Sequence, residues 1–306
     1  MNQERFLSFT VTKNDAGKRT DKVARKLLPD SGLGGIYAAL RKGKIRINGK
    51  KVKPSHPLHS GDTVEIDKSL QPKLPASSRN HSQHGIDISA YVLFENEHIL
   101  AINKPHGFTV HGPSSLEQGV RYYLADTVEP SLSFRPGPLH RLDKLTTGVL
   151  LFGKSLTGAR TFSRLLRVGQ VEKTYIGVVE GNVYQQLHWD EQISFRDRDE
   201  KKRAVTDVLP LQEEKTATLC RFMISTGRHH QIRYQASLHN LPLLGDTRYG
   251  GRKVNGGYIL HALRISLPHT EESLGFHTLS APLPDGTKKR LKTLFDADII
   301  DSLSSL

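Results

Sequence analysis

Residues 140–148 read His-Arg-Leu-Asp-Lys-Leu-Thr-Thr-Gly, and the apolar run Val-Leu-Leu-Phe follows at residues 149–152. A short apolar run bounded by polar residues predicts a buried strand, here over residues 149–153. The one acid of the stretch, Asp143, precedes this strand and is therefore expected at the mouth of a sheet. A carboxylate in that place is positioned for chemistry rather than for solubility.

Asp143 has two cationic neighbours in the sequence, Arg141 and Lys144. Nearby positive charge favours the ionised form of a carboxylate at neutral pH. An ionised, partly buried carboxylate can act as a nucleophile, a general base or a metal ligand, or it can simply staple a loop through an ion pair. No second acid lies at ligand spacing, so no metal site is predicted. His140 could take part in the chemistry, or it could pack beneath the loop.

A second dense polar segment lies at residues 227–233, Gly-Arg-His-His-Gln-Ile-Arg. Guanidinium groups pair in a bidentate way with carboxylates and phosphates. Arg228 and Arg233 therefore need anionic partners, either Asp143, RNA phosphate or both, unless the segment is only a basic helix face. Tyr175 alternates with apolar residues in a strand-like run and is expected to point inward, which packing alone would also explain.

The composition describes an ordinary globular protein of 306 residues, a length that suits two domains. No apolar run approaches the roughly 20 residues needed to span a bilayer, and the first residues lack the layout of a signal peptide. Cys220 is the one cysteine, so no intrachain disulfide can form. These features predict a cytoplasmic protein with a buried, structural thiol.

The formal net charge is +13, and the pI is about 9.7. The charge is uneven, because residues 1–70 hold 15 Lys and Arg against 7 Asp and Glu, which gives +8 of the total. Such a balance favours polyanionic partners, nucleic acid first and an acidic membrane surface second. Most of the excess belongs to an N-terminal module.

That module is predicted to hold two short helices and a basic hairpin. Thr20 is expected to cap a first helix that ends at Pro29 and the glycine-rich residues 31–35, before a second helix begins near Ile36. The Asn-Gly pair within residues 44–53 is a strong hairpin signal, with one apolar face and one basic face. A further strand is expected at residues 63–66.

This pattern resembles an S4-type RNA-binding domain. The resemblance is carried by residues 19–22, 40–43, 45–50 and 61–64. It predicts a small N-terminal αα-β domain over residues 1–67. Residues 68–88 are rich in Pro, Ser and polar side chains without periodicity, which predicts an exposed, flexible linker.

The remaining residues, 89–306, are expected to form an α+β domain around a mixed, mostly antiparallel sheet. Strands are predicted at residues 91–94, 99–102, 149–153, 173–179, 203–210, 216–225 and 259–262, with a short strand after Lys104. Helices are predicted from Ser114 or Ser115 to Leu124, from Ser155 to Leu166, at residues 230–238 and near 288–295. Residues 245–250 are expected to form a structural turn.

Several segments in order resemble the RluA family of pseudouridine synthases. The central motif is carried by residues 140–148, with Thr147 where the family more often has serine. Five further segments fit the family in order: residues 104–111, 173–175, 226–233, 245–250 and 260–262. The resemblance covers about residues 88–300, and the S4-type domain in front is similar to members that modify large-subunit ribosomal RNA. It implies the pseudouridine synthase fold.

The resemblance also implies roles for individual residues. Asp143 would be the catalytic carboxylate that attacks the target uridine, at C1′ of the sugar or C6 of the base. Tyr175 would stack on the base, and Arg233 would pair with Asp143. Arg141 would fill the gap left in the RNA stack when the base is everted. Leu260 would line the uracil pocket.

RNA contacts are further expected from Arg228, Lys104 and His140, and from Lys42 and Arg46 of the N-terminal domain. The implied activity is isomerisation of specific uridines to pseudouridine in RNA, most of all 23S or other large-subunit rRNA, by a monomer that needs no cofactor. A non-catalytic rRNA-binding or ribosome-assembly factor is the alternative from another class. A hydrolase of N-glycosidic bonds is disfavoured, because no second acid is placed to activate water.

Overall fold

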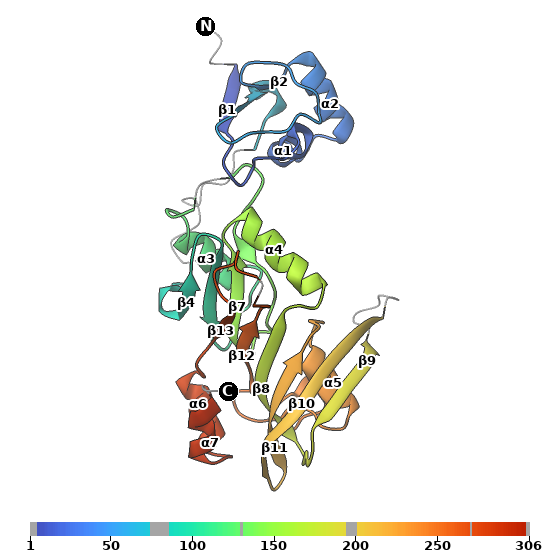
Figure 1. Ribbon diagram of the computed structural model, residues 1–306, viewed down its shortest axis with the longest axis vertical. Helices are drawn as coiled ribbons and strands as arrows, with labels where there is room; N and C mark the ends of the chain where they lie inside the picture. Colours follow the sequence, from blue (N-terminus) through green and yellow to red (C-terminus); the bar gives the residue numbers. More distant parts are fainter. Residues whose placement is uncertain (1–4, 74–85, 129–130, 194–200, 270, 304–306) are drawn as a thin grey trace.

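The computed structural model describes residues 5–73, 86–128, 131–193, 201–269 and 271–303. Within these residues the strands form two separate sheets, one of three strands and one of ten. Figure 1 shows the small sheet and its two helices at one end of an elongated molecule, and the large sheet with its helices filling the rest. The predicted class, α+β with a small N-terminal domain, is confirmed.

The N-terminal domain has three strands in the order β1-β3-β2, all antiparallel, and two helices. In chain order its elements are β1 (Phe6–Thr10), α1 (Thr20–Leu27), α2 (Leu33–Lys42), β2 (Ile45–Ile47) and β3 (Thr63–Asp67), followed by the 3-10 turn η1 (Lys68–Leu70). The sequence did not predict β1. The domain bounds stay a prediction, and residues 74–85 of the predicted linker lie outside the described residues.

Two local predictions for this domain need correction. Thr20 does not cap α1, because it is already the first helical residue and its hydroxyl donates to the carbonyl oxygen of His56 at 2.9 Å. Of the glycine-rich segment, only Ser31 and Gly32 lie between the helices. Gly34 and Gly35 lie in the first turn of α2, where the helix begins at Leu33.

The predicted tight turn is present, but the predicted hairpin is not. Asn48 and Gly49 both have positive φ, 50° and 76°, as a two-residue turn of this kind requires. Beyond the turn a single bridge joins Ile47 to Lys50, and β2 pairs instead with β3. Pro54 lacks the N–H that a continuing strand would need, so the chain leaves the ladder and returns only at Thr63.

The large sheet runs β4-β5-β7-β12-β8-β11-β10-β9, with β6 against β7 and β13 against β12. Only the β7–β12 pair is parallel among the pairings of the described strands. The strands are β4 (Val92–Glu95), β5 (Ile99–Lys104), β6 (Gly137–Pro138), β7 (Thr147–Gly153), β8 (Glu172–Glu180), β9 (Leu187–Ile193), β10 (Lys202–Glu214), β11 (Ala217–Ile224), β12 (Leu260–Ser266) and β13 (Thr278–Ser280).

The helices of this domain are α3 (Leu116–Tyr123), α4 (Leu156–Arg167), α5 (Gln231–Leu238), α6 (Asp285–Lys292) and α7 (Ala297–Ser302), with 3-10 turns η3 (Ser89–Tyr91) and η4 (Thr247–Tyr249). The predicted helices and strands are present with shifted ends. One exception is the short strand expected after Lys104, which is a loop. Four further elements were not predicted, namely β6, β9, β13 and α7. Within the described residues, none of the helices is both long and apolar enough to cross a membrane.

Strand β7 is buried along its whole length, as the apolar run predicted. Leu150 and Phe152 belong to one apolar core cluster, and Val149 and Leu151 to another, so the strand has a core on each face. At its start Gly148 has a φ of 107°, and a Cβ atom there would lie 2.2 Å from the carbonyl oxygen of Ala262 on β12. Only glycine permits this close approach of the two parallel strands.

Candidate active site

Asp143 lies in the loop between β6 and β7, four residues before β7 begins. A turn that closes with the amide of Thr146 on the Asp143 carbonyl fixes the loop, at 3.1 Å. Below it, the ammonium group of Lys104 donates to the carbonyl oxygens of Pro105 and Lys144, both at 3.0 Å. The side chain of Asp143 is thereby held half-buried at the edge of the sheet, where the sequence predicted it.

Asp143 takes its cationic partner from helix α5, not from its own loop. Arg233 Nη1 donates to Asp143 Oδ2 at 3.0 Å, and His230 Nε2 lies 3.5 Å from Oδ1. Arg141 and Lys144 are exposed, and among the described residues no ion pair joins either of them to this carboxylate. The two cations that neighbour Asp143 in the sequence are therefore not the ones that pair with it in the structure.

Arg233 is held in place by a second carboxylate. Its Nε and Nη2 donate to the two oxygens of Asp246, at 2.6 and 2.8 Å, while the ring of Tyr258 lies 4.4 Å from the guanidinium carbon. Burial acts to lower the pKa of Arg233, but the bonds to Asp246 and Asp143 outweigh it and raise that pKa above its usual value. The guanidinium is thus a fixed positive charge with one nitrogen aimed at Asp143.

The turn that carries Asp246 depends on Gly245. This glycine has a φ of 94°, and a Cβ atom there would lie 2.6 Å from the backbone of Gly257. The turn was expected to be structural only. In the folded protein it supplies the carboxylate that orients Arg233, so it belongs to the site.

His230 also contacts Asp143, although no role was predicted for it from the sequence. It precedes α5 with a φ of 52°, in the left-handed region that non-glycine residues rarely adopt. Its Nδ1 bonds to the Tyr249 hydroxyl at 2.9 Å, and its ring stacks on that of His229 at 3.8 Å. Burial lowers the pKa of His230 to about 4, so the ring is neutral at pH 7.

Tyr175 lies on β8 and is buried, with its side chain lining the pocket beside Asp143. Burial, together with the Asp143 carboxylate, raises the pKa of its phenol well above the ordinary value, which keeps the hydroxyl protonated. Leu260 begins β12 and lines the same pocket. The apolar and aromatic wall predicted for a base-binding pocket is therefore assembled from neighbouring strands.

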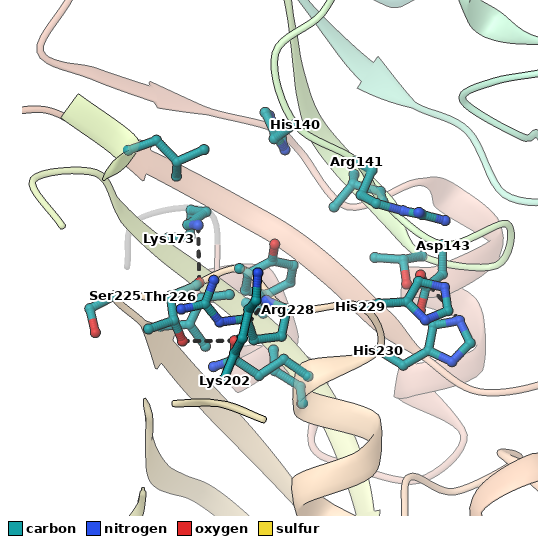
Figure 2. A pocket seen from close by; sticks show the side chains of 18 of the residues that line it. His140, Arg141, Asp143, Lys173, Lys202, Ser225, Thr226, Arg228, His229 and His230 are labelled. Atoms are coloured by element: carbon teal, nitrogen blue, oxygen red, sulfur yellow. Dashed lines mark hydrogen bonds and ion pairs between the residues drawn. The ribbon is translucent and has the colours of Figure 1, made fainter. Parts of the chain in front are cut away.

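The pocket in front of Asp143 has a volume of about 760 Å³. Figure 2 shows Asp143 with His229 and His230 at one end, and Lys173, Thr226, Arg228 and Lys202 gathered at the other. Its cationic lining comprises Arg141, Arg167, Lys173, Lys202, Arg203, Arg228 and Arg233. Volumes of this order suit a whole small ligand, and the lining suits a polyanion.

One expected RNA contact is corrected by the structure. Lys104 has no exposed surface, and burial lowers its pKa to about 7 although Asp143 acts in the opposite direction, so this residue supports the loop instead of touching RNA. His140 accepts a bond from the amide of Leu151 at 3.1 Å through Nε2, and burial lowers its pKa to about 3. It is a neutral, half-buried residue that fastens the loop to β7 and also lines the pocket, so its contact with RNA stays a prediction.

The other predicted contacts stay predictions. Arg228 is exposed at the pocket and is steadied by a bond from its Nε to the carbonyl oxygen of Arg203, at 3.0 Å. Lys42 is exposed at the end of α2 in the N-terminal domain. Arg46 is half-buried over the ring of Phe6, at 4.6 Å. Neither of these last two belongs to the pocket.

Asp143, His229 and His230 could in principle share a metal ion, because one ligand atom from each lies within 4.8 Å of the others. The surroundings work against it. One oxygen of Asp143 is bonded to Arg233, and the pocket lining carries further cations that repel a metal ion. The absence of a metal role stays a prediction.

The sheet, the pocket and the small N-terminal domain define a class of RNA-modifying enzyme, and comparison with known proteins agrees. The family model "RNA pseudouridylate synthase" matches residues 98–238, and the S4 domain model matches residues 19–64. The chain belongs to the RNA pseudouridylate synthase family, whose members are isomerases. The prediction of the family and of the S4-type domain is confirmed.

Among its relatives, the chain is 32% identical to ribosomal large subunit pseudouridine synthase C of Escherichia coli O157:H7, over 94% of this chain and 96% of that protein. It is 29% identical to the protein of the same name from Vibrio vulnificus strain CMCP6, over 93% of this chain and 95% of that protein. Human RNA pseudouridylate synthase domain containing 4 shares the fold, with a TM-score of 0.55 at 22% identity over 68% of this chain and 95% of that chain.

Proposed function

We propose that this enzyme isomerises specific uridines of large-subunit rRNA to pseudouridine, with Asp143 as the nucleophile. The observation that carries the proposal is the ion pair between Asp143 and Arg233, which lies beside a buried tyrosine in a basic pocket. A carboxylate that has one oxygen on an arginine and the other beside a neutral histidine, at the wall of a cavity, is suited to attack an electrophilic carbon.

In the proposed reaction Asp143 attacks the everted uridine at C1′ of the ribose or C6 of the uracil. The bond between C1′ and N1 breaks, the uracil turns, and a bond between C1′ and C5 forms. The proton on C5 is lost, N1 gains a proton, and the carboxylate is released. The reaction is an isomerisation, so no redox partner or energy source is consumed.

Tyr175 and Leu260 form the wall against which the uracil would stack. Because the phenol of Tyr175 stays protonated, we propose that it orients the base and donates a hydrogen bond during the turn of the ring. Arg233 would orient the Asp143 carboxylate throughout, because Asp246 fixes the position of the guanidinium group.

Eversion of a base from folded RNA costs a few kcal/mol of unstacking and unpairing. Arg141 is exposed at the rim of the pocket, next to Asp143 in Figure 2, and is placed to fill the gap that the base leaves. The cations at the far end of the pocket, with Arg228 among them, would bind the phosphates that flank the everted nucleotide.

Large-subunit rRNA is proposed as the substrate because the relatives named above carry it in their names. The S4-type domain and its basic charge support an extended RNA contact, to which Lys42 and Arg46 would contribute. We propose a cytoplasmic monomer with domains at residues 1–67 and 89–306, since one chain supplies all the residues placed in the site.

The test compares rRNA from cells with and without this protein by carbodiimide modification and primer extension. Loss of one or more pseudouridines, restored by the wild-type chain but not by Asp143→Asn, is the expected result. An unchanged map in the deletion strain, together with rRNA binding by the purified protein, would instead favour a non-catalytic assembly factor.

A further inference from the structure

The two domains are joined by a buried carboxylate. Asp15 of the N-terminal domain has no exposed surface, and its oxygens accept bonds from a segment of the catalytic domain. The donors are the Ser131 hydroxyl at 2.7 Å, the Leu132 amide at 2.9 Å, and the Ser133 amide and hydroxyl at 3.0 and 2.5 Å. A carboxylate that gives up hydration in this way is held firmly only when its lone pairs are satisfied, as they are here.

Three further contacts cross the same boundary. Lys18 donates to the Ser133 hydroxyl at 2.6 Å. Leu132 is 8% exposed and joins the apolar core cluster of the N-terminal domain, although it belongs to the catalytic domain. Asn14 accepts a bond from the amide of Leu156 at 2.8 Å, at the first turn of α4.

Helix α4 links this boundary to the pocket. Its first residue bonds to Asn14, while Ser163, Leu166 and Arg167 near its other end line the cavity in front of Asp143. Figure 1 shows α4 directly below the N-terminal domain. A helix of this length is a stiff element, so a domain fixed to its start is also fixed relative to the pocket.

We propose that Asp15 is a positioning residue that locks the S4-type domain at a fixed distance from Asp143, so that the uridine modified is one that lies at a set offset from the RNA segment bound by that domain. The proposal rests on the proposed function and deepens it. A domain tethered only by a flexible linker would accept many offsets, whereas a docked domain accepts few.

The charge state of Asp15 supports a permanent lock. Burial acts to raise the pKa of Asp15, but the hydrogen bonds from Ser133, Leu132, Ser131 and Thr12 outweigh it, and the pKa lies below its ordinary value. The carboxylate therefore stays ionised at neutral pH, and the contact persists there.

The first experiment measures the geometry in the full chain. Spin labels are placed on cysteines introduced at Thr10 and Tyr122, two exposed positions in different domains, while Cys220 is buried and escapes labelling. Asp15→Ala and Leu132→Ala should each broaden the distance distribution between the labels. Asp67→Ala is the matched control, since Asp67 is a buried carboxylate whose side-chain partners among the described residues are Arg5 and Ser69 of its own domain.

The second experiment measures activity on two RNAs, a full-length large-subunit rRNA transcript and a short hairpin that carries only the modified uridine. With Asp15→Ala, kcat/KM on the transcript should fall about tenfold through KM, as expected for a lost effective concentration. Activity on the hairpin should be unchanged, and extra or shifted pseudouridines should appear in the transcript. Asp67→Ala should behave as wild type on both.

A narrow, wild-type distance distribution in Asp15→Ala, or an equal loss of activity on the transcript and the hairpin, would overturn the proposal. Failure of the proposed function gives a different outcome, because wild-type protein would then form no pseudouridine in either RNA while the label distances could still be compared.

Discussion

Arg233 lies between two carboxylates, with Nη1 at 3.0 Å from Asp143 and its other two nitrogens on Asp246. Each of the three nitrogens of the guanidinium group therefore donates to a carboxylate oxygen, which fixes its orientation. The two carboxylates therefore have different roles at Arg233. Asp246 orients the cation, and the cation orients and neutralises Asp143.

Replacing Asp143 by asparagine should abolish the chemistry without altering the shape of the site. The amide is not a nucleophile of comparable strength, so we expect pseudouridine formation to fall about 10⁴-fold or more, with RNA affinity unchanged. Single-turnover assays with wild-type and Asp143→Asn protein check this. Asp207→Asn is the control and should keep full activity, because Asp207 is a half-buried acid on β10 that pairs with His188 and does not line the pocket.

Replacing Arg233 by lysine keeps the positive charge but removes the planar guanidinium group with its several N–H donors. A single ammonium group cannot bond to Asp143 and to both oxygens of Asp246, so Asp143 should be displaced. A shift of the reacting group by about 1 Å costs on the order of 100-fold in rate, which is the loss expected for Arg233→Lys. The readout is kcat under saturating RNA. Arg252→Lys, at an exposed arginine near Glu180, is the control, and an equal loss in both variants would refute the assignment.

Acid should destabilise this protein through its buried histidines. Burial lowers the pKa of His140 to about 3, and of His230 and His261 to about 4, from the ordinary value of 6.5. Between pH 6.5 and pH 4 the unfolded chain binds protons that the folded chain does not. The free energy of unfolding should therefore fall as the pH drops through this window, by at most about 1.4 kcal/mol per pH unit for each histidine.

Urea unfolding at several pH values measures this slope. His140→Gln should flatten it, because the amide oxygen can still accept from the Leu151 amide but does not titrate. His188→Gln should have the opposite effect and lower the free energy of unfolding at low pH. A bond to Asp207 raises the pKa of this exposed histidine, so its charged form stabilises the fold there. A slope unaltered in His140→Gln would show that this ring is not kept neutral.

Neutralising Lys42 should weaken RNA binding in a salt-dependent way. Each phosphate contact contributes about −0.7 to −0.9 to the slope of log affinity against log salt concentration, so Lys42→Gln should make the slope shallower by about that amount. Lys292→Gln, on α6 at the other end of the molecule in Figure 1, should leave the slope unchanged. Identical slopes in wild type and Lys42→Gln would remove Lys42 from the interface.

This variant is a cleaner test than deletion of residues 1–67. Such a deletion is expected to weaken RNA binding and to leave the chemistry able to run on small substrates. The structure shows that it would also strip the apolar cover from Leu132 and leave the donors at residues 131–133 without Asp15. A loss of binding by the truncated protein would then mix a lost contact with a damaged surface.

Local patterns in the sequence were enough to place most elements of the catalytic domain. The apolar run before Gly153 and the alternation around Tyr175 both correspond to strands. Strand β9 was missed because it lies at the edge of the sheet, where Trp189 and Ile193 point inward between charged and polar residues. Many side chains of this edge strand are exposed to solvent, so its sequence is as polar as that of a loop.

The site was predicted less completely, because its key distances join residues far apart in the chain. Arg233 lies 90 positions after Asp143. The residues alone offered Asp143 as one of two possible anionic partners, and the family resemblance singled it out. Lys104 was expected to contact RNA, but it is buried under the loop. Because lysines are usually exposed, that burial has no sequence signature. Asp246 and His230 could have been singled out only as polar residues within motifs already noted.

The contact of Gly148 with the β12 backbone affects how a loss of activity in Gly148 variants should be interpreted. The loop that carries Asp143 enters the sheet at a point without room for a single methyl group. A substitution at this glycine would push two strands apart and displace Asp143 with them. An inactive variant at that position would therefore report on lost geometry, and it would give no information about which groups take part in the reaction.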